Sequence, residues 1–273
     1  MLSLTKLAIL TGGVLCAVLA NVAISLKLPK KVHVDIPVKG LPGRLHGLKI
    51  LHLSDIHNKS TTRINVDVWD IVSKTDFDLA VITGDMTERY FDQVLPLKKP
   101  LTVLAARVPV FFVDGNHEQT HFKEMKAFMN SCGVTVLDDC KVTLEIKGTP
   151  LEILGIRDYY YQKWRRFKSF ERLMEDEVKC GFRILLSHQP QIIDKLSYFE
   201  DILVLCGHTH GGQIRLPFTN TIVAPGQGFF PKYGNGFYKV KSCYMYISRG
   251  IGASRIPVRF FNRPEVAVLR LVE

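Results

Sequence analysis

The strongest constraint on the fold of this 273-residue chain is a local pattern that occurs five times. A short run of apolar residues, rich in Val, Ile and Leu, is followed at once by a cluster that contains Asp, Asn or His. Continuous apolar runs of this length are typical of strands that are buried on both faces of a sheet. The runs are Leu48–Leu53, Leu79–Thr83, Val108–Val113, Phe182–Leu186 and Ile202–Cys206.

The segments between these runs indicate how the strands are connected. Val66–Thr75, Phe91–Ala106 and His121–Asn130 are compatible with helices, and strands that alternate with helices predict an α/β sandwich. The region from Thr221 to Val272 is rich in glycine and short alternating runs, which indicates antiparallel or mixed strands. Because no linker interrupts the later part of the chain, we expect residues 48–273 to form one domain.

The N-terminal segment Leu7–Leu26 contains no charged residue. As an α-helix it would be about 30 Å long, which matches the hydrocarbon core of a bilayer. A cleaved signal peptide needs a shorter apolar core, although Val18–Ala20 could serve as its cleavage site. We therefore expect residues 1–26 to be an uncleaved membrane anchor. Residues 27–47 carry three prolines and four lysines, which predicts a basic, extended linker.

The net charge of +10 bears on the partners of the chain. A basic surface suits an anionic membrane surface or a phosphorylated substrate, and no nucleic-acid partner is expected because no motif of that kind occurs. Lys27, Lys30 and Lys31 follow the anchor and favour a cytoplasmic catalytic domain in a single-pass protein of the cell membrane. The cysteines form no CxxC pair, which agrees with a reducing compartment. The oligomeric state is left open.

The clusters after the apolar runs contain side chains that can bind metals. They follow predicted strands at the carboxyl ends, where ligands bind in open α/β sheets. In an extended segment, two residues separated by one position point to the same side, and two pairs in the clusters have this spacing. Mixed oxygen and nitrogen ligands without thiolate suit Mn, Fe or Zn. The residues are Asp55, His57, Asp85, Asn116, His117, His188, His208 and His210.

The order Asp-x-His, Gly-Asp, Gly-Asn-His-Glu, His, Gly-His-x-His is similar to that of the calcineurin-like metallophosphoesterase superfamily, over about residues 48–270. The stretches Gly207–Pro217 and Ser248–Gly252 resemble a branch of membrane-associated bacterial phosphoesterases related to UDP-2,3-diacylglucosamine pyrophosphohydrolases. The resemblance implies a sandwich of two mixed β-sheets flanked by helices. It also implies a metal-dependent phosphohydrolase of the phosphodiesterase or pyrophosphatase type.

The resemblance further implies a role for each of the eight residues around two divalent metal ions. One carboxylate would bridge the ions, and six ligands would be divided equally between them. The first ion would be held by Asp55, His57 and His210, the second by Asn116, His188 and His208, and both by Asp85. The remaining residue, His117, would protonate the leaving oxygen. A hydroxide between the two ions could then attack phosphorus in line.

Four further residues are candidates for supporting roles. Arg215 and Arg249 lie within the stretches that carry the resemblance and could contact phosphate oxygens, or they could form ordinary surface salt bridges. Glu118 and Asp114 flank the Gly-Asn-His cluster and are candidates to orient the histidines.

The stretch Asp158–Phe167 mixes aromatic and basic residues, which suits a membrane interface or a lipid phosphate. The alternative is a loop that leads into an amphipathic helix at about Ser169–Lys179.

The sequence leaves three functions open. The first is a membrane-anchored phosphoesterase for a phosphodiester or pyrophosphate in a lipid-linked or nucleotide-linked molecule. The second is a phosphoprotein phosphatase, and the third is a metal-binding interaction module without catalysis.

Overall fold

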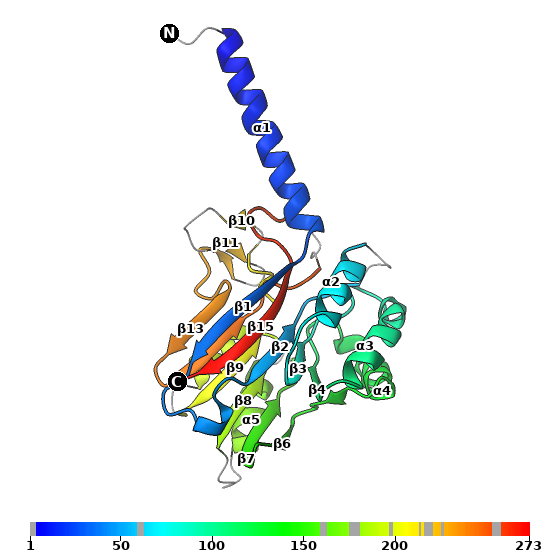
Figure 1. The fold of residues 1–273 in the computed structure, drawn as a ribbon, viewed down its shortest axis with the longest axis vertical. Coiled ribbons are helices and arrows are strands. Elements are labelled where there is room, and N and C mark those ends of the chain that lie inside the picture. Colours follow the sequence, from blue (N-terminus) through cyan, green and yellow to red (C-terminus); the bar gives the residue numbers. More distant parts are fainter. Residues whose placement is uncertain are drawn as a thin grey trace.

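The computed structural model describes residues 4–58, 63–158, 163–174, 181–196, 199–212, 214–215, 221–224, 227–252 and 258–273. In these residues two six-stranded sheets pack face to face, and helices cover their outer faces (Figure 1). The predicted sandwich of two mixed sheets flanked by helices is therefore confirmed.

The first sheet is mixed, with a block of parallel strands that extends from its centre to one edge. Strands β2, β3, β4 and β5 run parallel to one another, β15 is antiparallel to β2, and β1 is parallel to β15. Across the sheet, the order is β1 (Lys30–Pro37), β15 (Glu265–Val272), β2 (Lys49–Leu53), β3 (Leu79–Thr83), β4 (Val110–Val113) and β5 (Thr135–Val136).

The second sheet also combines both orientations. Strands β7, β8, β9 and β14 are parallel, while β6 and β13 are antiparallel edge strands. Its order is β13 (Gly236–Val240), β14 (Cys243–Ile247), β9 (Ile202–Cys206), β8 (Phe182–Leu186), β7 (Thr149–Gly155) and β6 (Cys140–Ile146). The apolar runs predicted from the sequence coincide with β2, β3, β4, β8 and β9 within two residues.

Three apolar layers hold the sandwich together. The middle layer joins the inner faces of the two sheets, through residues such as Val81 and Leu203. The outer layers pack helices on each sheet, with Phe112 in one layer and Phe170 in the other. The helical elements are η1 (Gly43–Leu45), α2 (Arg63–Ser73), η2 (Phe91–Leu97), α3 (Lys98–Ala105), η3 (Gln119–His121), α4 (Phe122–Ser131), α5 (Lys163–Met174) and η4 (Pro190–Lys195).

Two predicted helices differ from the observed ones. The helix expected over Phe91–Ala106 is divided into η2 and α3, because Pro96 lies inside the first part and has no backbone N–H to donate. The helix expected from Ser169 begins earlier, at Lys163, inside the stretch read as a loop. Residues 159–162 of that stretch and residues 175–180 of the expected helix lie outside the described residues.

The expected linker is wrong for residues 30–37, because they form β1. This strand pairs with β15 along its whole length, from Lys30 opposite Glu265 to Pro37 opposite Val272. Its apolar residues alternate with charged ones, and Ile36 is fully buried against the sheet. The alternation is the pattern of a half-buried edge strand, in which the charges face water. The sheet therefore includes a strand that precedes residue 48.

Helix α1 (Leu4–Lys27) extends away from the sandwich (Figure 1). Its segment Ile9–Lys27 is long and apolar enough to cross a membrane, and almost none of it is buried against the protein. The base of the helix is attached to the body by hydrogen bonds. The N–H of Phe261 donates to Oδ1 of Asn21 over 2.8 Å, and the Arg263 guanidinium donates to the carbonyl of Leu28.

A small third sheet lies close to the base of α1 (Figure 1). It is antiparallel and consists of β10 (Ile214–Arg215), β11 (Thr221–Ala224) and β12 (Gly228–Phe229). The chain enters this sheet directly after the Gly-His-Thr-His cluster, so the third sheet continues the loop that carries that cluster.

Candidate metal centre

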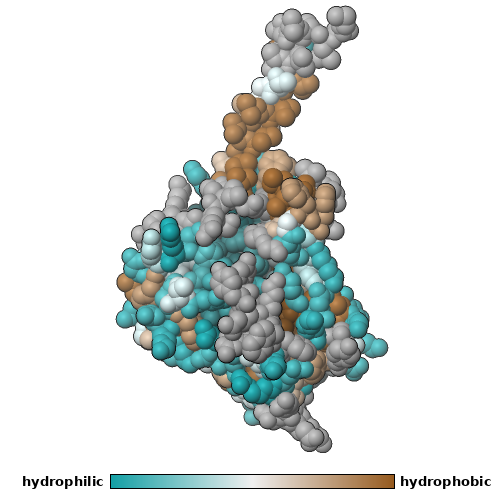
Figure 2. Space-filling model, turned by 180° about the vertical axis from the view of Figure 1, so that it is seen from behind, coloured by the Kyte–Doolittle hydropathy of each residue, from teal (hydrophilic) through white to brown (hydrophobic). Residues whose placement is uncertain are grey.

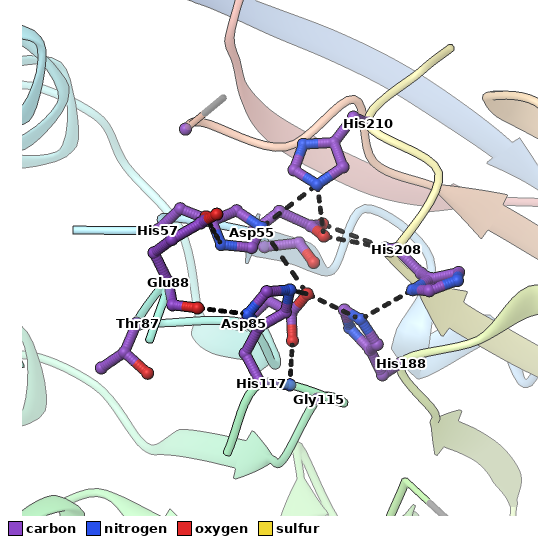
Figure 3. A network of polar contacts seen from close by, with 12 residues as sticks. Asp55, His57, Asp85, Thr87, Glu88, Gly115, His117, His188, His208 and His210 are labelled. Carbon is purple, nitrogen blue, oxygen red and sulfur yellow. Dashed lines mark hydrogen bonds and ion pairs between the residues drawn. The ribbon is translucent and has the colours of Figure 1, made fainter. Parts of the chain in front are cut away.

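The metal-competent clusters follow β2, β3, β4, β8 and β9 at the ends where these strands leave the two sheets. The first three strands are parallel neighbours in one sheet, and the last two are parallel neighbours in the other. Within each sheet, the carboxyl ends of parallel strands share an edge. The clusters of the two sheets meet there, since Nε2 of His188 lies 3.2 Å from Oδ2 of Asp85. Figure 3 shows side chains from all five clusters directed into one small space, with His117 representing the Gly-Asn-His cluster.

The backbone at this site is not extended, as the spacing of Asp55 and His57 had suggested. Both residues have left-handed backbone, with φ angles of 49° and 42°. Asp85, His208 and His210 also have positive φ angles, of 54°, 70° and 50°. This conformation is uncommon for residues other than glycine. The side chains converge because the chain turns sharply at each residue, and not because an extended strand alternates.

One group of ligand atoms comes from Asp55, His57 and His210. All three residues are buried, and one ligand atom from each lies within 4.8 Å of the others. Nε2 of His57 is 3.1 Å from Nε2 of His210, and the latter atom is 3.6 Å from Oδ1 of Asp55. These are the residues that the sequence resemblance assigned to the first ion.

A second group comes from Asp85, His188 and His208, again with ligand atoms within 4.8 Å of one another. Nε2 of His188 is 3.2 Å from Oδ2 of Asp85 and 3.2 Å from Nδ1 of His208. Oδ2 of Asp85 is also 3.6 Å from Nε2 of His57, so this carboxylate lies between the two groups. In the described part of the chain, the buried Oδ1 of Asn116 has no hydrogen-bond partner.

His117 stands at the more open side of the two groups. Its side chain is 23% exposed, and its Nε2 lies 3.8 Å from Oδ2 of Asp85. Its Nδ1 is hydrogen-bonded to the carbonyl oxygen of Glu88, which can only accept, so Nδ1 carries a proton. Nε2 is therefore the ring atom that faces the site.

The histidines are oriented by groups other than those expected. Neither Asp114 nor Glu118 hydrogen-bonds to a histidine among the described residues. Instead, Nδ1 of His188 donates to the carbonyl of Thr83 over 2.7 Å, which directs Nε2 toward Asp85. Nδ1 of His57 lies 3.0 Å from Oε2 of Glu88, an ion-pair distance at an angle outside hydrogen-bond geometry. Sequence reasoning missed Glu88, whose only signal is its position shortly after Asp85.

Glu118 has a different structural role, because its carboxylate joins two of the loops. Oε2 accepts the N–H groups of Asp85 and Gly115, each over 2.8 Å. Oε1 accepts those of Met86 and Thr87 over 2.9 and 3.2 Å. Burial raises the pKa of Glu118, as does the negative charge of Asp85, while these backbone donors oppose the shift. The loops after β3 and β4 are thereby held together at the site.

Asp114 lies further from the histidines, on the side of the site that faces the loop after β7. Oδ1 accepts the N–H of Asp158 over 3.0 Å, and Oδ2 lies 3.4 Å from the Arg157 guanidinium. Burial raises the pKa of Asp114 to about 8, although the charge of Arg157 opposes the shift. Asp114 therefore supports the loop that follows β7 and leaves the imidazoles to other partners.

The buried carboxylate of Asp85 makes its side of the site attractive to positive charge. Burial alone would lower the pKa of His188, but the negative charge of Asp85 raises it well above its ordinary value. Burial would raise the pKa of Asp85, but the positive charge of His188 holds it well below its usual range. Asp85 is therefore a buried carboxylate that stays ionised among imidazole nitrogens, and such a mixed set of oxygen and nitrogen donors suits divalent cations.

The two predicted arginines lie near this site and near each other. Nε of Arg249 is 3.2 Å from Oε2 of Glu265, and Nε of Arg215 has no hydrogen-bond partner among the described residues. Burial and the positive charge of Arg249 lower the pKa of Arg215. Arg259 was not singled out in the sequence. It is buried, donates to the carbonyls of Arg249 and Gly252, and approaches Nδ1 of His210 to 3.5 Å.

Comparisons with known proteins agree with this geometry. A family described as calcineurin-like phosphoesterase matches residues 48–212. The uncharacterised metallophosphoesterase YkuE of Bacillus subtilis is 32% identical over 241 residues, which cover 85% of this chain and 81% of that protein. The phosphodiesterase YaeI of Escherichia coli is 28% identical over 233 residues, which cover 82% of each protein. The chain belongs to the calcineurin-like phosphoesterase family and is a metal-dependent phosphohydrolase.

Two further relatives bear on the membrane segment and on the fold. A Danio rerio protein named transmembrane protein with metallophosphoesterase domain is 31% identical over 96% of this chain, which spans 61% of that protein. Together with α1, this relationship indicates association with a membrane. The crystal structure of TT1561 of Thermus thermophilus covers 75% of this chain and 90% of that chain at 11% identity, and its TM-score of 0.51 supports the fold. The relation to UDP-2,3-diacylglucosamine pyrophosphohydrolases stays a prediction.

Proposed function

We propose that this protein is a membrane-anchored phosphoesterase that uses two divalent metal ions to hydrolyse a phosphodiester or pyrophosphate bond. The proposed ions are Mn, Fe or Zn, and the substrate is a lipid-linked or nucleotide-linked molecule. The observation that carries the proposal is the position of Asp85, whose Oδ2 lies 3.2 Å from Nε2 of His188 and 3.6 Å from Nε2 of His57. A carboxylate between two groups of imidazoles can bridge two cations and reduce their mutual repulsion.

The grouping of the donor atoms supports two ions, because Asp55, His57 and His210 form one buried group and Asp85, His188 and His208 form another. The first ion would be held by Asp55, His57 and His210, and the second by Asn116, His188 and His208. The amide of Asn116 supports this division, because a buried oxygen without a hydrogen-bond partner is costly unless a cation approaches it. The His188 Nδ1–H bond to Thr83 likewise leaves Nε2 as the ring atom available to a metal.

When bound, two such ions neutralise charge on phosphate oxygens and lower the pKa of water. The chain's own residues supply the remaining steps. His117, fixed through Nδ1 to the Glu88 carbonyl, would hold a proton at Nε2 and transfer it to the leaving oxygen. Arg215 and Arg249 would bind non-bridging oxygens of the phosphate, since a guanidinium matches that geometry.

Membrane anchoring by α1 supports a lipid-linked substrate. Residues 9–27 have the length and composition of a single span, and the body is fastened to the base of this helix. Lys27, Lys30 and Lys31 follow the span and support a cytoplasmic catalytic domain. A protease applied to intact cells tests the orientation, because it would digest the domain only if the domain lies outside.

The experiment that tests the reaction uses the full chain, since truncation near residue 32 would cut β1. The protein is stripped of metal, reloaded with Mn, Fe or Zn, and assayed with bis(4-nitrophenyl) phosphate, a nucleotide-linked diacylglucosamine and a phosphopeptide. We expect hydrolysis of the diester or the pyrophosphate, with about two ions bound per chain. Turnover of the phosphopeptide alone would favour a phosphoprotein phosphatase and overturn the proposal.

Two variants separate the roles of the residues. Asp85→Asn should abolish turnover and reduce bound metal, while Asp92→Asn, an exposed aspartate in η2, should change neither. His117→Ala should lower turnover at unchanged metal content, with His33→Ala in β1 as its control. Loss of metal from His117→Ala would mean that this histidine is a ligand and not a proton donor.

A further inference from the structure

The third sheet carries a row of apolar residues that backbone pairing brings into line. Phe229 pairs with Val223, Val223 pairs with Ile214, and Ile214 forms a bridge to Phe260. Directly paired residues on neighbouring strands place their side chains on the same face. Neighbouring strands lie about 4.8 Å apart, so the row extends over roughly 14 Å. Phe230 and Phe261 follow two of these residues in the sequence, and we call the six residues together the apolar row.

Four of the six residues in the apolar row are exposed, while Val223 and Phe260 are half-buried. Phe229 is 76% exposed, Phe230 is 81% exposed, and Phe261 and Ile214 are 44% and 38% exposed. Phe230 and Phe261 have left-handed backbone, with φ angles of 50° and 51°, which is rare for bulky residues. Figure 2 shows apolar surface gathered beside the base of α1, where the surrounding surface of the body is largely hydrophilic. Large aromatic side chains held in a strained, exposed conformation indicate a surface that contacts an apolar partner.

The position of the apolar row identifies that partner. The N–H of Phe261 donates to Asn21 within α1, and Arg263 donates to the carbonyls of Leu28 and Pro29 just after the helix. The row therefore lies at the end of the candidate span Ile9–Lys27, on segments bonded to that end. A leaflet crossed by α1 would meet this part of the body first.

We propose that the apolar row docks into the lipid leaflet from which α1 emerges, as a second membrane contact that fixes the orientation of the catalytic domain. Aromatic side chains are enriched at the boundary between headgroups and acyl chains, where their rings are removed from water. Lys27 and Lys30 flank Leu28 and Pro29, whose carbonyls bind Arg263, so the two lysines would be available to anionic headgroups beside the row. The inference rests on the membrane anchor within the proposed function.

Docking in this orientation brings the metal centre close to the leaflet. Nδ2 of Asn262 donates to the carbonyl of His210 over 2.7 Å and also to the carbonyl of Gly212. The segment that carries Phe260 and Phe261 is thereby joined to the loop that carries His210. A phosphate at headgroup depth would therefore be presented to the metal centre without leaving the membrane surface, which deepens the proposal of a lipid-linked substrate.

Fluorescence quenching in vesicles tests the docking directly. Full-length Phe229→Trp and Phe230→Trp variants are reconstituted into phosphatidylcholine vesicles with or without bromine on the acyl chains. The matched control is Val103→Trp, a 54% exposed position in α3, and Leu15→Trp in α1 reports whether the anchor is inserted. Each signal is the increment over the wild-type protein, which contains Trp69 and Trp164. We expect bromine to quench the increments at 229 and 230 at least about threefold more than at 103.

Equal quenching at positions 229, 230 and 103 would overturn the proposal, whether or not Leu15→Trp is quenched. Protection of Phe229→Trp and Phe230→Trp from aqueous acrylamide without quenching by bromine would also overturn it. That outcome would mean that a second copy of the chain covers the row. Quenching at Leu15→Trp without quenching at 229 and 230 would mean that α1 is inserted but that the apolar row does not dock. The test therefore distinguishes failure of the docking proposal from failure of the membrane anchor.

An activity measurement gives the second readout. The double variant Phe229→Ser/Phe230→Ser should hydrolyse a vesicle-embedded lipid phosphodiester at least about tenfold more slowly, with unchanged turnover of water-soluble bis(4-nitrophenyl) phosphate. The control Leu95→Ser/Val103→Ser removes exposed apolar residues from η2 and α3 and should affect neither. Equal activity of the two double variants on the embedded substrate would contradict docking, and turnover of the soluble diester tests the proposed function independently.

Discussion

Replacing Glu118 by Gln should weaken both the stability of the protein and its metal centre. Each carboxylate oxygen of Glu118 accepts two backbone N–H groups, at distances from 2.8 to 3.2 Å. Glutamine has one oxygen and one NH2 group. In either orientation the NH2 group therefore faces two N–H donors, and two of the four hydrogen bonds are lost.

The magnitude follows from the charge and burial of this group. Hydrogen bonds to a charged partner contribute about 1.5–3 kcal/mol each, so loss of two costs about 3–6 kcal/mol. Burial raises the pKa of Glu118, which means that keeping the charge also costs free energy, and the neutral amide recovers part of it. We expect a net loss of about 2–4 kcal/mol, which corresponds to a fall in Tm of roughly 5–15 °C for a domain of this size.

Thermal unfolding of the full chain in detergent, followed by circular dichroism in the presence of a chelator, measures this effect. Glu171→Gln is the matched control, because Glu171 is exposed on α5. Metal content is measured in parallel. We expect it to fall in Glu118→Gln, because the N–H of Asp85 loses its fixed partner. A Tm within about 2 °C of the wild-type value would refute the argument that this carboxylate holds the two loops together.

Two other substitutions test the packing and the titration of buried groups near the site. A Cβ added at Gly207 would overlap Ser54 and the carboxylate of Asp55, so Gly207→Ala should reduce bound metal and activity. The control Gly43→Ala places its Cβ in open space and should leave both unchanged. Metal analysis and diester turnover measure the two effects. Burial lowers the pKa of His52 to about 3. The pKa of His52 in the unfolded chain is about 6.5. The stabilising contribution of neutral His52 is therefore fully present above pH 6.5, and it falls by about 1.4 kcal/mol per pH unit as the pH is lowered toward 3. Urea unfolding of His52→Gln should show a smaller loss from pH 6.5 to 5, and a profile parallel to the wild type would contradict this.

The convergence of the metal-competent clusters could be predicted because it depends on a simple property of parallel strands. Continuous apolar runs identified β2, β3, β4, β8 and β9, and their shared carboxyl edge brings the clusters together. Strand β1 was not predicted, because its partner strand β15 begins more than 200 residues later in the sequence. Its lysines and prolines are also typical of a linker, and only the alternation of Val32, Val34 and Ile36 indicated a strand.

The supporting residues could not be assigned from the sequence for a different reason. Glu118 was noticed because it adjoins His117. Its partners are backbone N–H groups, and the types of residue in the sequence do not identify such partners. Glu88 acts partly through its carbonyl oxygen, and any residue at that position would supply one. The apolar row depends on the register of short strands separated by turns, and register is set in three dimensions.

The backbone strain at the metal centre connects these observations. Five of the seven proposed ligands have left-handed backbone, and such residues cost on the order of 1–3 kcal/mol each. Their backbone groups are bonded from one cluster to another. The N–H of Asp55 donates to Gly84, that of His57 donates to Asp85, and that of His208 donates to the carboxylate of Asp55. Three of the five strained residues are therefore held by another cluster, so the fold positions these ligands before a cation arrives. A change that releases one cluster, such as Glu118→Gln, should consequently weaken metal binding even though no ligand has been altered.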